Sequence, residues 1–235
     1  MNILIFTNAD RLDAKRIRVS GPRLQHLNEI LQIQVGQSLR VGELNGLCGQ
    51  GVVLELDDSQ ALLSIDLSEP PPPKLALTLV LALPRPKMLR RILRTVAELG
   101  VSDLHLINSY RVEKSYWNTP ALNTDTVQAY FTAGLEQARD TTLPNLHLHP
   151  RFKPFVEDTL PGLLADKQGL AAHPGSYPDC PRGTHENVLL AIGPEGGFIP
   201  FEVEKLQHAG CEIVSLGERI MRVETAVTHI IGRLF

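Results

Sequence analysis

Short runs of alternating apolar and polar residues occupy the first third of the chain. Three of these runs have the two-residue period of half-buried strands, with Gly, Asn or Asp between them: QSLRVGEL (37–44), GQGVVLELD (49–57) and QALLSIDL (60–67). A fourth stretch, GPRLQHLNEIL (21–31), has the spacing of one short helix. The pattern is typical of a small antiparallel barrel or sandwich.

Beyond residue 74 the chain changes to continuous apolar runs that alternate with helical patterns. Such runs are typical of strands buried on both faces, and they cover 75–83, 103–108, 169–173, 187–192 and 211–216. Helical spacing covers about 86–99, the stretch between the last two runs, and the stretch after the last one. This alternation predicts an α/β fold with a buried parallel sheet.

Four consecutive prolines separate the two patterns. Residues Pro70 to Pro73 cannot donate ladder hydrogen bonds, and they favour an extended spacer. We therefore predict a first domain over residues 1–69, a linker over 70–74 and a second domain over 75–235.

Composition narrows the class of protein. The 235 residues carry a net charge of −3, which argues against electrostatic binding of nucleic acid over the whole surface. No apolar run reaches the roughly 20 residues of a membrane helix, and the N-terminal apolar run is too short for a signal peptide, so we expect a cytoplasmic protein without a membrane partner. Cys48, Cys180 and Cys211 lie too far apart for a Cys-x-x-Cys zinc site, and we expect no metal.

Two local clusters of cations stand out against this acidic background. On a helical wheel, one narrow arc of the stretch 86–99 holds Lys87, Arg90, Arg91 and Arg94. An ordinary solvated face is one interpretation, but cations with few acids between them repel one another, so a face that meets phosphates is the other. A second run, diluted by Asp10 and Asp13, contains Arg11, Lys15, Arg16, Arg18 and Arg23. Together the clusters suggest contact with RNA or DNA.

Unusual residues follow three of the predicted strands. They are His173-Pro174, the stretch 193–197 and Gly217. If these strands are parallel neighbours, the three loops leave the same edge of the sheet, where open α/β sheets bind ligands. Glu195 lies within the second loop, where it could accept hydrogen bonds from ribose hydroxyls or face a cationic ligand. A tight connection and a packed imidazole are the ordinary alternatives for this loop and for His173.

The last block, SLGERIMRVETAVTHIIGRLF, carries Arg222, Glu224 and Thr225 at the start of an amphipathic helix. Core packing and a dimer interface compete to explain the apolar face of this helix, which consists of Val223, Val227, Ile230, Ile231 and Leu234.

Taken together, these blocks resemble the ribosomal RNA small subunit methyltransferase E family of SPOUT-class methyltransferases. The resemblance covers nearly the whole chain, and it is carried by AELGV (97–101), HP (173–174), IGPEGGF (192–198) and SLGERIMRVETA (215–226). The chain departs from the family pattern at Thr95 and in the stretch 137–139, and both departures bear on RNA contact.

The resemblance implies a PUA-like RNA-binding barrel in the first domain, and a second domain whose C-terminal segment threads a deep trefoil knot. It also implies S-adenosylmethionine as the cofactor and a homodimer formed through the knotted domain. The implied reaction is methylation of ring nitrogen 3 of a uridine in 16S ribosomal RNA of the small subunit.

The same resemblance assigns roles to individual residues. Glu224 is the expected general base for the uridine proton, and Arg222 is expected to stabilise negative charge on the uracil carbonyls. A simple ion pair at the helix start is the alternative for both. The cofactor is expected to contact Leu170, His173, Ile192, Gly193, Glu195, Gly196, Gly197, Leu216, Gly217, Ile220 and Met221. Independently of the resemblance, the two basic clusters predict that RNA contacts Arg11, Arg16, Arg18, Arg23, Lys87, Arg90, Arg91 and Arg94.

Two other functions stay open from the sequence. One is a non-enzymatic RNA-binding protein whose loops no longer hold a cofactor, although the intact glycines and His173 argue against it. The other is a related methyltransferase with a different RNA target, such as transfer RNA or a 2′-hydroxyl group.

Overall fold

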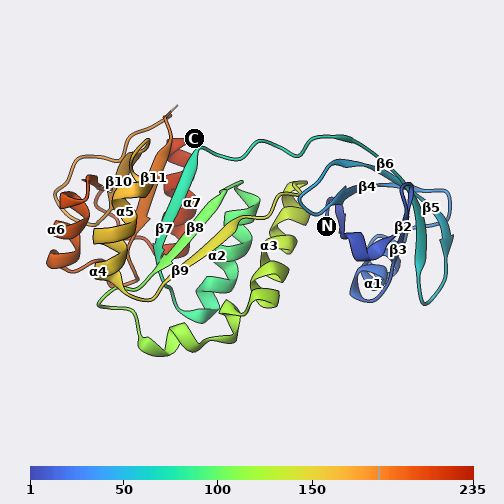
Figure 1. The fold of residues 1–235 in the computed structure, drawn as a ribbon, viewed down its shortest axis with the longest axis horizontal. Coiled ribbons are helices and arrows are strands. Elements are labelled where there is room, and N and C mark those ends of the chain that lie inside the picture. The colour runs from blue at the N-terminus through green and yellow to red at the C-terminus, as the bar shows by residue number, and fades with distance from the viewer. Residues whose placement is uncertain (185) are drawn as a thin grey trace. The chain divides into compact units, whose positions relative to one another are not determined.

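A computed structural model describes residues 1–184 and 186–235 of the chain (Figure 1). The chain forms two compact units. The first unit comprises Met1–Pro73 and Thr132–Leu143, and the second comprises Lys74–Phe131 and Pro144–Phe235. One division therefore falls at the proline run.

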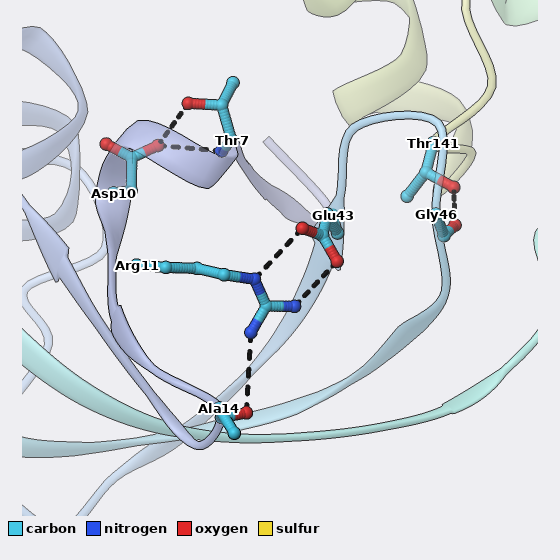
Figure 2. Close-up of polar contacts among 7 residues, drawn as sticks. All are labelled: Thr7, Asp10, Arg11, Ala14, Glu43, Gly46 and Thr141. Atoms are coloured by element: carbon cyan, nitrogen blue, oxygen red, sulfur yellow. Dashed lines mark hydrogen bonds and ion pairs between the residues drawn. The ribbon is translucent and has the colours of Figure 1, made fainter.

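Residues 132–143 belong to the first unit, although the sequence assigned all of 75–235 to the second domain. Hydrogen bonds explain the difference. The backbone N–H of Asn45 donates to the Thr141 carbonyl at 2.7 Å, and the Thr141 hydroxyl donates to the Gly46 carbonyl at 2.5 Å (Figure 2). Thr141 is fully buried, so these bonds join the segment to the first unit with little competition from water.

The first unit contains one six-stranded sheet in the order β1-β4-β5-β6-β3-β2. Its elements are β1 (Leu4–Phe6), β2 (Arg11–Asp13), β3 (Arg16–Val19), β4 (Ser38–Glu43), β5 (Cys48–Leu56), β6 (Ala61–Glu69), the 3-10 turn η1 (Asn8–Asp10) and helix α1 (Pro22–Glu29). The predicted strands β4, β5 and β6 and the predicted helix are confirmed.

The purely antiparallel arrangement expected for this sheet is wrong at one edge. Strand β1 pairs in parallel with β4, whereas the other pairs are antiparallel. A parallel pair needs a long connection, and the chain supplies one because β2, β3 and α1 lie between β1 and β4. Apolar side chains from these strands and from α1, including Phe6, Ile17 and Leu27, form a buried core.

The second unit contains a six-stranded sheet in the order β12-β10-β11-β7-β8-β9, and every neighbouring pair is parallel. The predicted buried parallel sheet is therefore confirmed. Its strands are β7 (Leu77–Ala82), β8 (Asp103–Ile107), β9 (Asn145–His149), β10 (Gln168–Ala172), β11 (Val188–Ile192) and β12 (Cys211–Val214). Strand β9 is the one that the sequence pattern did not predict.

The larger helices of this unit are α2 (Pro86–Glu98), α6 (Pro200–His208) and α7 (Val223–Leu234), all of which were predicted. Helix α3 (Thr124–Ala138) was not predicted and contributes residues to both units. Shorter turns complete the unit: η2 (Lys114–Asn118), η3 (Pro120–Leu122), α4 (Phe152–Pro154), η4 (Phe155–Thr159) and α5 (Leu160–Leu163). In the described part of the chain, no helix has the length and hydropathy to cross a membrane.

Helix α7 uses its apolar face inside the unit. Its apolar residues are nearly all inaccessible to solvent, at 0 to 4% exposed: Val223, Val227, Ile230, Ile231 and Leu234. The helix packs against α2. Core packing, one of the two uses considered for this face, is thereby confirmed.

The connection between β10 and β11 lies against two later parts of the chain. The Cys180 N–H donates to the Ser215 carbonyl at 2.8 Å, just after β12. Further along, the Thr184 N–H donates to the Leu234 carbonyl at 2.6 Å, and Arg233 Nε donates back to the Cys180 carbonyl at 2.7 Å. This connection therefore holds both the segment that follows β12 and the C-terminal end of α7.

Candidate active site

Three loops meet at the carboxyl edge of the parallel sheet. Strands β12, β10 and β11 are adjacent and run in the same direction, so the loops that follow them leave the same edge. The convergence predicted from the sequence is confirmed, and this edge is where open α/β sheets bind ligands.

A pocket of about 600 Å³, part of it open to solvent, lies between these loops. Most of the predicted cofactor residues line it: His173, Ile192, Gly193, Glu195, Gly197, Leu216, Gly217, Ile220 and Met221. Further lining residues were not predicted, namely Ala172, Pro174, Pro194, Arg219, Val223 and Ala226. The two remaining predicted residues lie outside the lining, because Leu170 is fully buried in β10 and Gly196 faces Arg111.

The glycine loop, residues 193–198, makes a tight turn beside the pocket. Gly197 has φ +71°, a conformation that side chains with a Cβ rarely adopt, and its N–H donates to the Pro194 carbonyl at 2.7 Å. A Cβ on Gly197 would lie 3.5 Å from Cε1 of His173. Glycine at this position therefore permits the turn, and the loop lies within contact distance of the imidazole.

His173 brings an unpaired polar atom into this region. Its backbone N–H donates to the Val214 carbonyl at 3.0 Å, whereas its Nδ1 atom is buried and has no hydrogen-bond partner within the residues that the structure describes. Burial lowers the pKa of His173, and the positive charge of Arg111 lowers it further. The imidazole is therefore neutral near pH 7 and can hydrogen-bond a ligand.

Glu195 lines the pocket and is exposed to solvent. Its Oε1 atom lies 3.4 Å from the backbone nitrogen of Arg85, the N-cap residue just before helix α2. The amino end of a helix attracts negative charge, so the carboxylate interacts favourably there. A ribose or a cationic ligand, the two partners considered from the sequence, would compete with Arg85 for the Glu195 carboxylate.

The two residues with predicted catalytic roles lie at the start of α7. Arg222 is the N-cap of that helix and is exposed, while Glu224 is half-buried in the first turn. Neither lines the pocket, although Met221 and Val223, the neighbours of Arg222, both do. Arg222 and Glu224 form no ion pair with each other among the contacts of the described residues. Glu224 instead lines a shallow groove together with Arg91, Thr95, Thr225, Thr228 and His229.

A comparison with known families identifies this arrangement. Residues 71–234 match the model of a family described as an RNA methyltransferase domain. This chain belongs to that family. The match contains every element that lines the pocket, so the pocket lies in the part of the chain that defines the family.

Individual relatives agree with this assignment. A ribosomal RNA small subunit methyltransferase E from Treponema pallidum is 28% identical over 96% of this chain and 87% of that protein. A protein of the same name from Synechocystis is 26% identical over 93% of this chain and 72% of that protein. The resemblance to the small subunit methyltransferase E family, inferred from the sequence blocks, is thereby confirmed.

Two solved structures with methyltransferase names share the fold. The crystal structure of a ribosomal RNA small subunit methyltransferase E from Neisseria gonorrhoeae, bound to S-adenosyl methionine, superposes with a TM-score of 0.77. It is 20% identical, and the match covers 97% of this chain and 95% of that one. A methyltransferase from Legionella pneumophila, also in complex with this cofactor, superposes with a TM-score of 0.75 at 20% identity.

The predicted basic face of α2 is present in the structure. Its cationic residues, Lys87, Arg90, Arg91 and Arg94, are all exposed. Leu89, Ile92 and Leu93 on the opposite face are at most 1% exposed. The guanidinium of Arg94 lies over the Tyr130 ring, 5.0 Å from its centroid. The wheel pattern therefore describes this helix correctly, while its contact with RNA stays a prediction.

Most of the N-terminal arginines are engaged in ion pairs instead. Arg11 forms a bidentate pair with Glu43, at 3.0 Å from Nε and 2.6 Å from Nη2 (Figure 2). Arg23 pairs with Asp10 at 2.6 Å, and Arg16 pairs with Asp13 at 2.7 Å. Arg18 is exposed, and no ion pair involves it within the described part of the chain.

Besides the lining residues named above, two residues that support the glycine loop lay outside the sequence prediction. Arg111 donates a hydrogen bond to the Gly196 carbonyl in the glycine loop, and Glu202 accepts hydrogen bonds that fix the backbone before Arg111. Arg111 follows strand β8 in a loop with no periodic pattern, and Glu202 reads as an ordinary polar position of α6. No local signal in the sequence singles out either residue.

Proposed function

We propose that this protein is an S-adenosylmethionine-dependent methyltransferase that modifies ring nitrogen 3 of a uridine in 16S ribosomal RNA of the small subunit. The observation that carries the proposal is a pocket at the carboxyl edge of the parallel sheet, in a chain that belongs to the RNA methyltransferase family. The names of its relatives point to the small subunit as the source of the RNA.

The residues of the pocket fit S-adenosylmethionine. Apolar side chains such as Ile192, Leu216 and Met221 offer contact to a nucleoside, and the glycine loop presents backbone groups. The neutral imidazole of His173 avoids placing a cation beside the positively charged sulfonium, and its orphaned Nδ1 atom is available to a ligand. When bound, the cofactor supplies a methyl group that is already activated on sulfur.

The protein must then position the uridine and accept its proton. Arg222 is proposed to stabilise the negative charge that develops on the uracil carbonyls, because it lies between two residues that line the pocket, Met221 and Val223. Glu224, one residue beyond Val223, is proposed as the group that accepts the proton from the ring nitrogen. The exposed cations of α2 are proposed to hold the phosphates of the RNA.

The finer features of the fold belong to the same proposal. The sheet of the first unit is proposed to be a PUA-like RNA-binding barrel. A trefoil knot in the second unit is supported by the hydrogen bonds of the connection between β10 and β11, which reach both Ser215 and the end of α7.

A homodimer and a cytoplasmic location complete the proposal. The homodimer rests on the family resemblance, since the apolar face of α7 is already buried within the chain. The cytoplasmic location follows from a ribosomal RNA substrate.

Cofactor binding and nucleoside analysis test the function in sequence. Calorimetry should detect binding of S-adenosylmethionine to the purified protein. Small subunits from a strain lacking the protein should gain N3-methyluridine in their 16S RNA when incubated with the protein and cofactor. Binding of RNA without binding of the cofactor would identify a non-enzymatic RNA-binding protein. Methylation of transfer RNA or of a 2′-hydroxyl group alone would identify a different target.

A further inference from the structure

A fourth strand contributes to the pocket, although only three strands supply its lining. Strand β8 is separated from β11 by β7 in the sheet. The loop after β8 nevertheless reaches the glycine loop, where the Arg111 guanidinium donates to the Gly196 carbonyl. Arg111 therefore joins the glycine loop to the loop after β8, a strand that lies two positions from β11 in the sheet.

The backbone before Arg111 is held firmly by a buried carboxylate. Glu202, which is 2% exposed, accepts hydrogen bonds from the Ser109 hydroxyl at 3.0 Å and from the Tyr110 N–H at 2.7 Å. The same carboxylate accepts the Ile199 N–H at 3.0 Å, directly after the glycine loop. Hydrogen bonds to a charged, buried group are among the strong ones. One carboxylate thus fixes the β8 loop and the end of the glycine loop together.

The side chain of Arg111 also packs against the backbone of the glycine loop. A Cβ added to Gly196 would lie 2.8 Å from Cδ of Arg111, which is too close for an ordinary contact. A side chain at this position would therefore have to displace the Arg111 stem. Gly196 therefore meets Arg111 through both its carbonyl oxygen and its Cα.

The charge of Arg111 acts on the pocket as well. After burial, it is the second cause that lowers the pKa of His173. The ring of Tyr177 meets the imidazole edge-on, with centroids 5.8 Å apart. Among the described residues, Arg111 is the charged group whose electrostatic effect lowers the pKa of His173. The guanidinium therefore helps to keep this ring neutral.

We propose that Arg111 is a positioning residue of the methyl-donor pocket, which holds the Gly196 carbonyl so that the glycine loop keeps its cofactor-binding conformation. The inference rests on the proposed function, because it assumes that S-adenosylmethionine is the ligand of the pocket. It assigns Arg111 no contact with the reacting atoms.

The first experiment measures S-adenosylmethionine affinity by calorimetry for the wild type, Arg111→Met and Arg111→Lys. Methionine keeps an apolar stem and removes the donors, so we expect affinity to fall at least tenfold. Lysine keeps one charged donor and should recover part of the loss. Arg151→Gln removes an exposed arginine outside the pocket and is the matched control, with affinity expected to stay at the wild-type value.

A double-mutant cycle separates positioning from general damage to the fold. Gly196→Ala should weaken binding in the wild type because its methyl group collides with the Arg111 stem. The same change should weaken binding much less in an Arg111→Ala background, where the stem is absent, so the two effects should not add. Thermal unfolding of each variant checks that the affinities belong to folded protein.

A proton NMR titration of His173 gives a readout that a purely structural role would leave unchanged. Arg111→Met should raise the pKa of His173, whereas Arg111→Lys should leave it close to the wild-type value. Failure of the wild type to bind the cofactor would contradict the proposed function itself. Wild-type binding combined with unchanged affinity in Arg111→Met, or with an additive cycle, would overturn the role of Arg111 alone.

Discussion

The two clusters of arginines look alike in the sequence and differ in the structure. On α2, the side chains of Lys87, Arg90 and Arg91 are exposed and form no ion pairs within the described part of the chain. In the first unit, most of the arginines are neutralised by Asp10, Asp13 and Glu43. A cation that is already paired must lose its partner before it can bind a phosphate strongly. We therefore predict that α2 makes the main electrostatic contact with RNA.

The largest expected effect comes from reversing the free cations. The double variant Arg90→Glu, Arg91→Glu should lower RNA affinity about 100-fold, a loss of roughly 2.7 kcal/mol, and should abolish methylation of small subunits. The salt dependence of binding should fall by about 1.4 to 1.8 units of log–log slope, since each phosphate contact contributes about 0.7 in single strands and about 0.9 in a duplex. Filter binding at several salt concentrations measures both quantities.

Cofactor affinity and folding should survive this change, because both side chains point away from the buried face of α2. Arg151→Glu, Arg182→Glu makes the same change in net charge at exposed positions elsewhere and is the control. An unchanged salt slope in the α2 variant would mean that this face is only solvated. RNA would then have to bind through the first unit.

Acid should also distinguish the two units. In the second unit, His105 and His149 are 3.0 Å apart between Nδ1 and Nε2, so one ring must be neutral to accept the hydrogen bond. Burial, with the neighbouring His147 and His149, lowers the pKa of His105 from its ordinary 6.5 to about 4. Between pH 6.5 and pH 4 the unfolded chain binds a proton at His105 that the folded chain does not. The free energy of unfolding therefore falls as the pH drops from 6.5 toward 4.

Between pH 7 and pH 5 the second unit should therefore lose about 2 kcal/mol of stability. In the first unit, the hydrogen bond from Arg11 lowers the pKa of Glu43 below its ordinary 4.5. The stability that this ion pair contributes is therefore lost only below pH 4.5. The single tryptophan, Trp117, lies in the second unit and reports its unfolding by fluorescence. His105→Leu should remove most of the pH dependence. Equal loss in both units over this range would contradict the assignment.

A third prediction concerns the paired arginine of the first unit. Arg11→Ala breaks a bidentate ion pair that is partly exposed, and it should cost about 1 kcal/mol of folding stability. Its effect on the salt slope of RNA binding should be small. Arg18→Ala is the matched control, because that side chain is exposed and should cost almost no stability. If Arg11→Ala lowered the slope by a full phosphate contact, the two clusters would be equivalent after all.

The difference between the clusters also marks the limit of what the sequence predicts. Asp10 and Asp13 lie near the arginines in the chain, so the sequence alone shows that they offset part of the positive charge. Glu43 is 32 residues from Arg11 in the chain. Glu43 lies in β4, and only the pairing of β4 with β1 in the folded sheet brings it close to Arg11. A local sequence pattern predicts the exposed face of one helix, such as α2. Ion pairs between distant residues depend on how the strands are arranged, which the local pattern does not contain.

The same distinction holds for the strands and for the pocket. Strands β7, β10 and β11 were predictable because their burial on both faces requires continuous apolar residues. Strand β9 was missed because it forms an edge of the sheet, and its sequence NLHLH is partly exposed. The three loops could be inferred from strand ends, but Arg111 could not, since its contact with Gly196 spans 85 residues.

The smallest expected effect tests Arg94, a cation of α2 that contacts an aromatic ring. The Arg94 guanidinium lies over the Tyr130 ring, and an exposed cation–π contact contributes about 0.5 kcal/mol. Arg94→Gln should therefore lower folding stability by about this amount, while Arg90→Gln should leave it unchanged. Urea unfolding of the two variants, and of each in a Tyr130→Leu background, measures the coupling.

Arg94 stays positively charged while it contacts the Tyr130 ring. Arg94→Gln should therefore still reduce the RNA salt slope, by less than Arg90→Gln does. Equal slopes would show that stacking on Tyr130 does not draw the cation away from the phosphates, and the contrast between free and engaged cations would then apply to ion pairs alone.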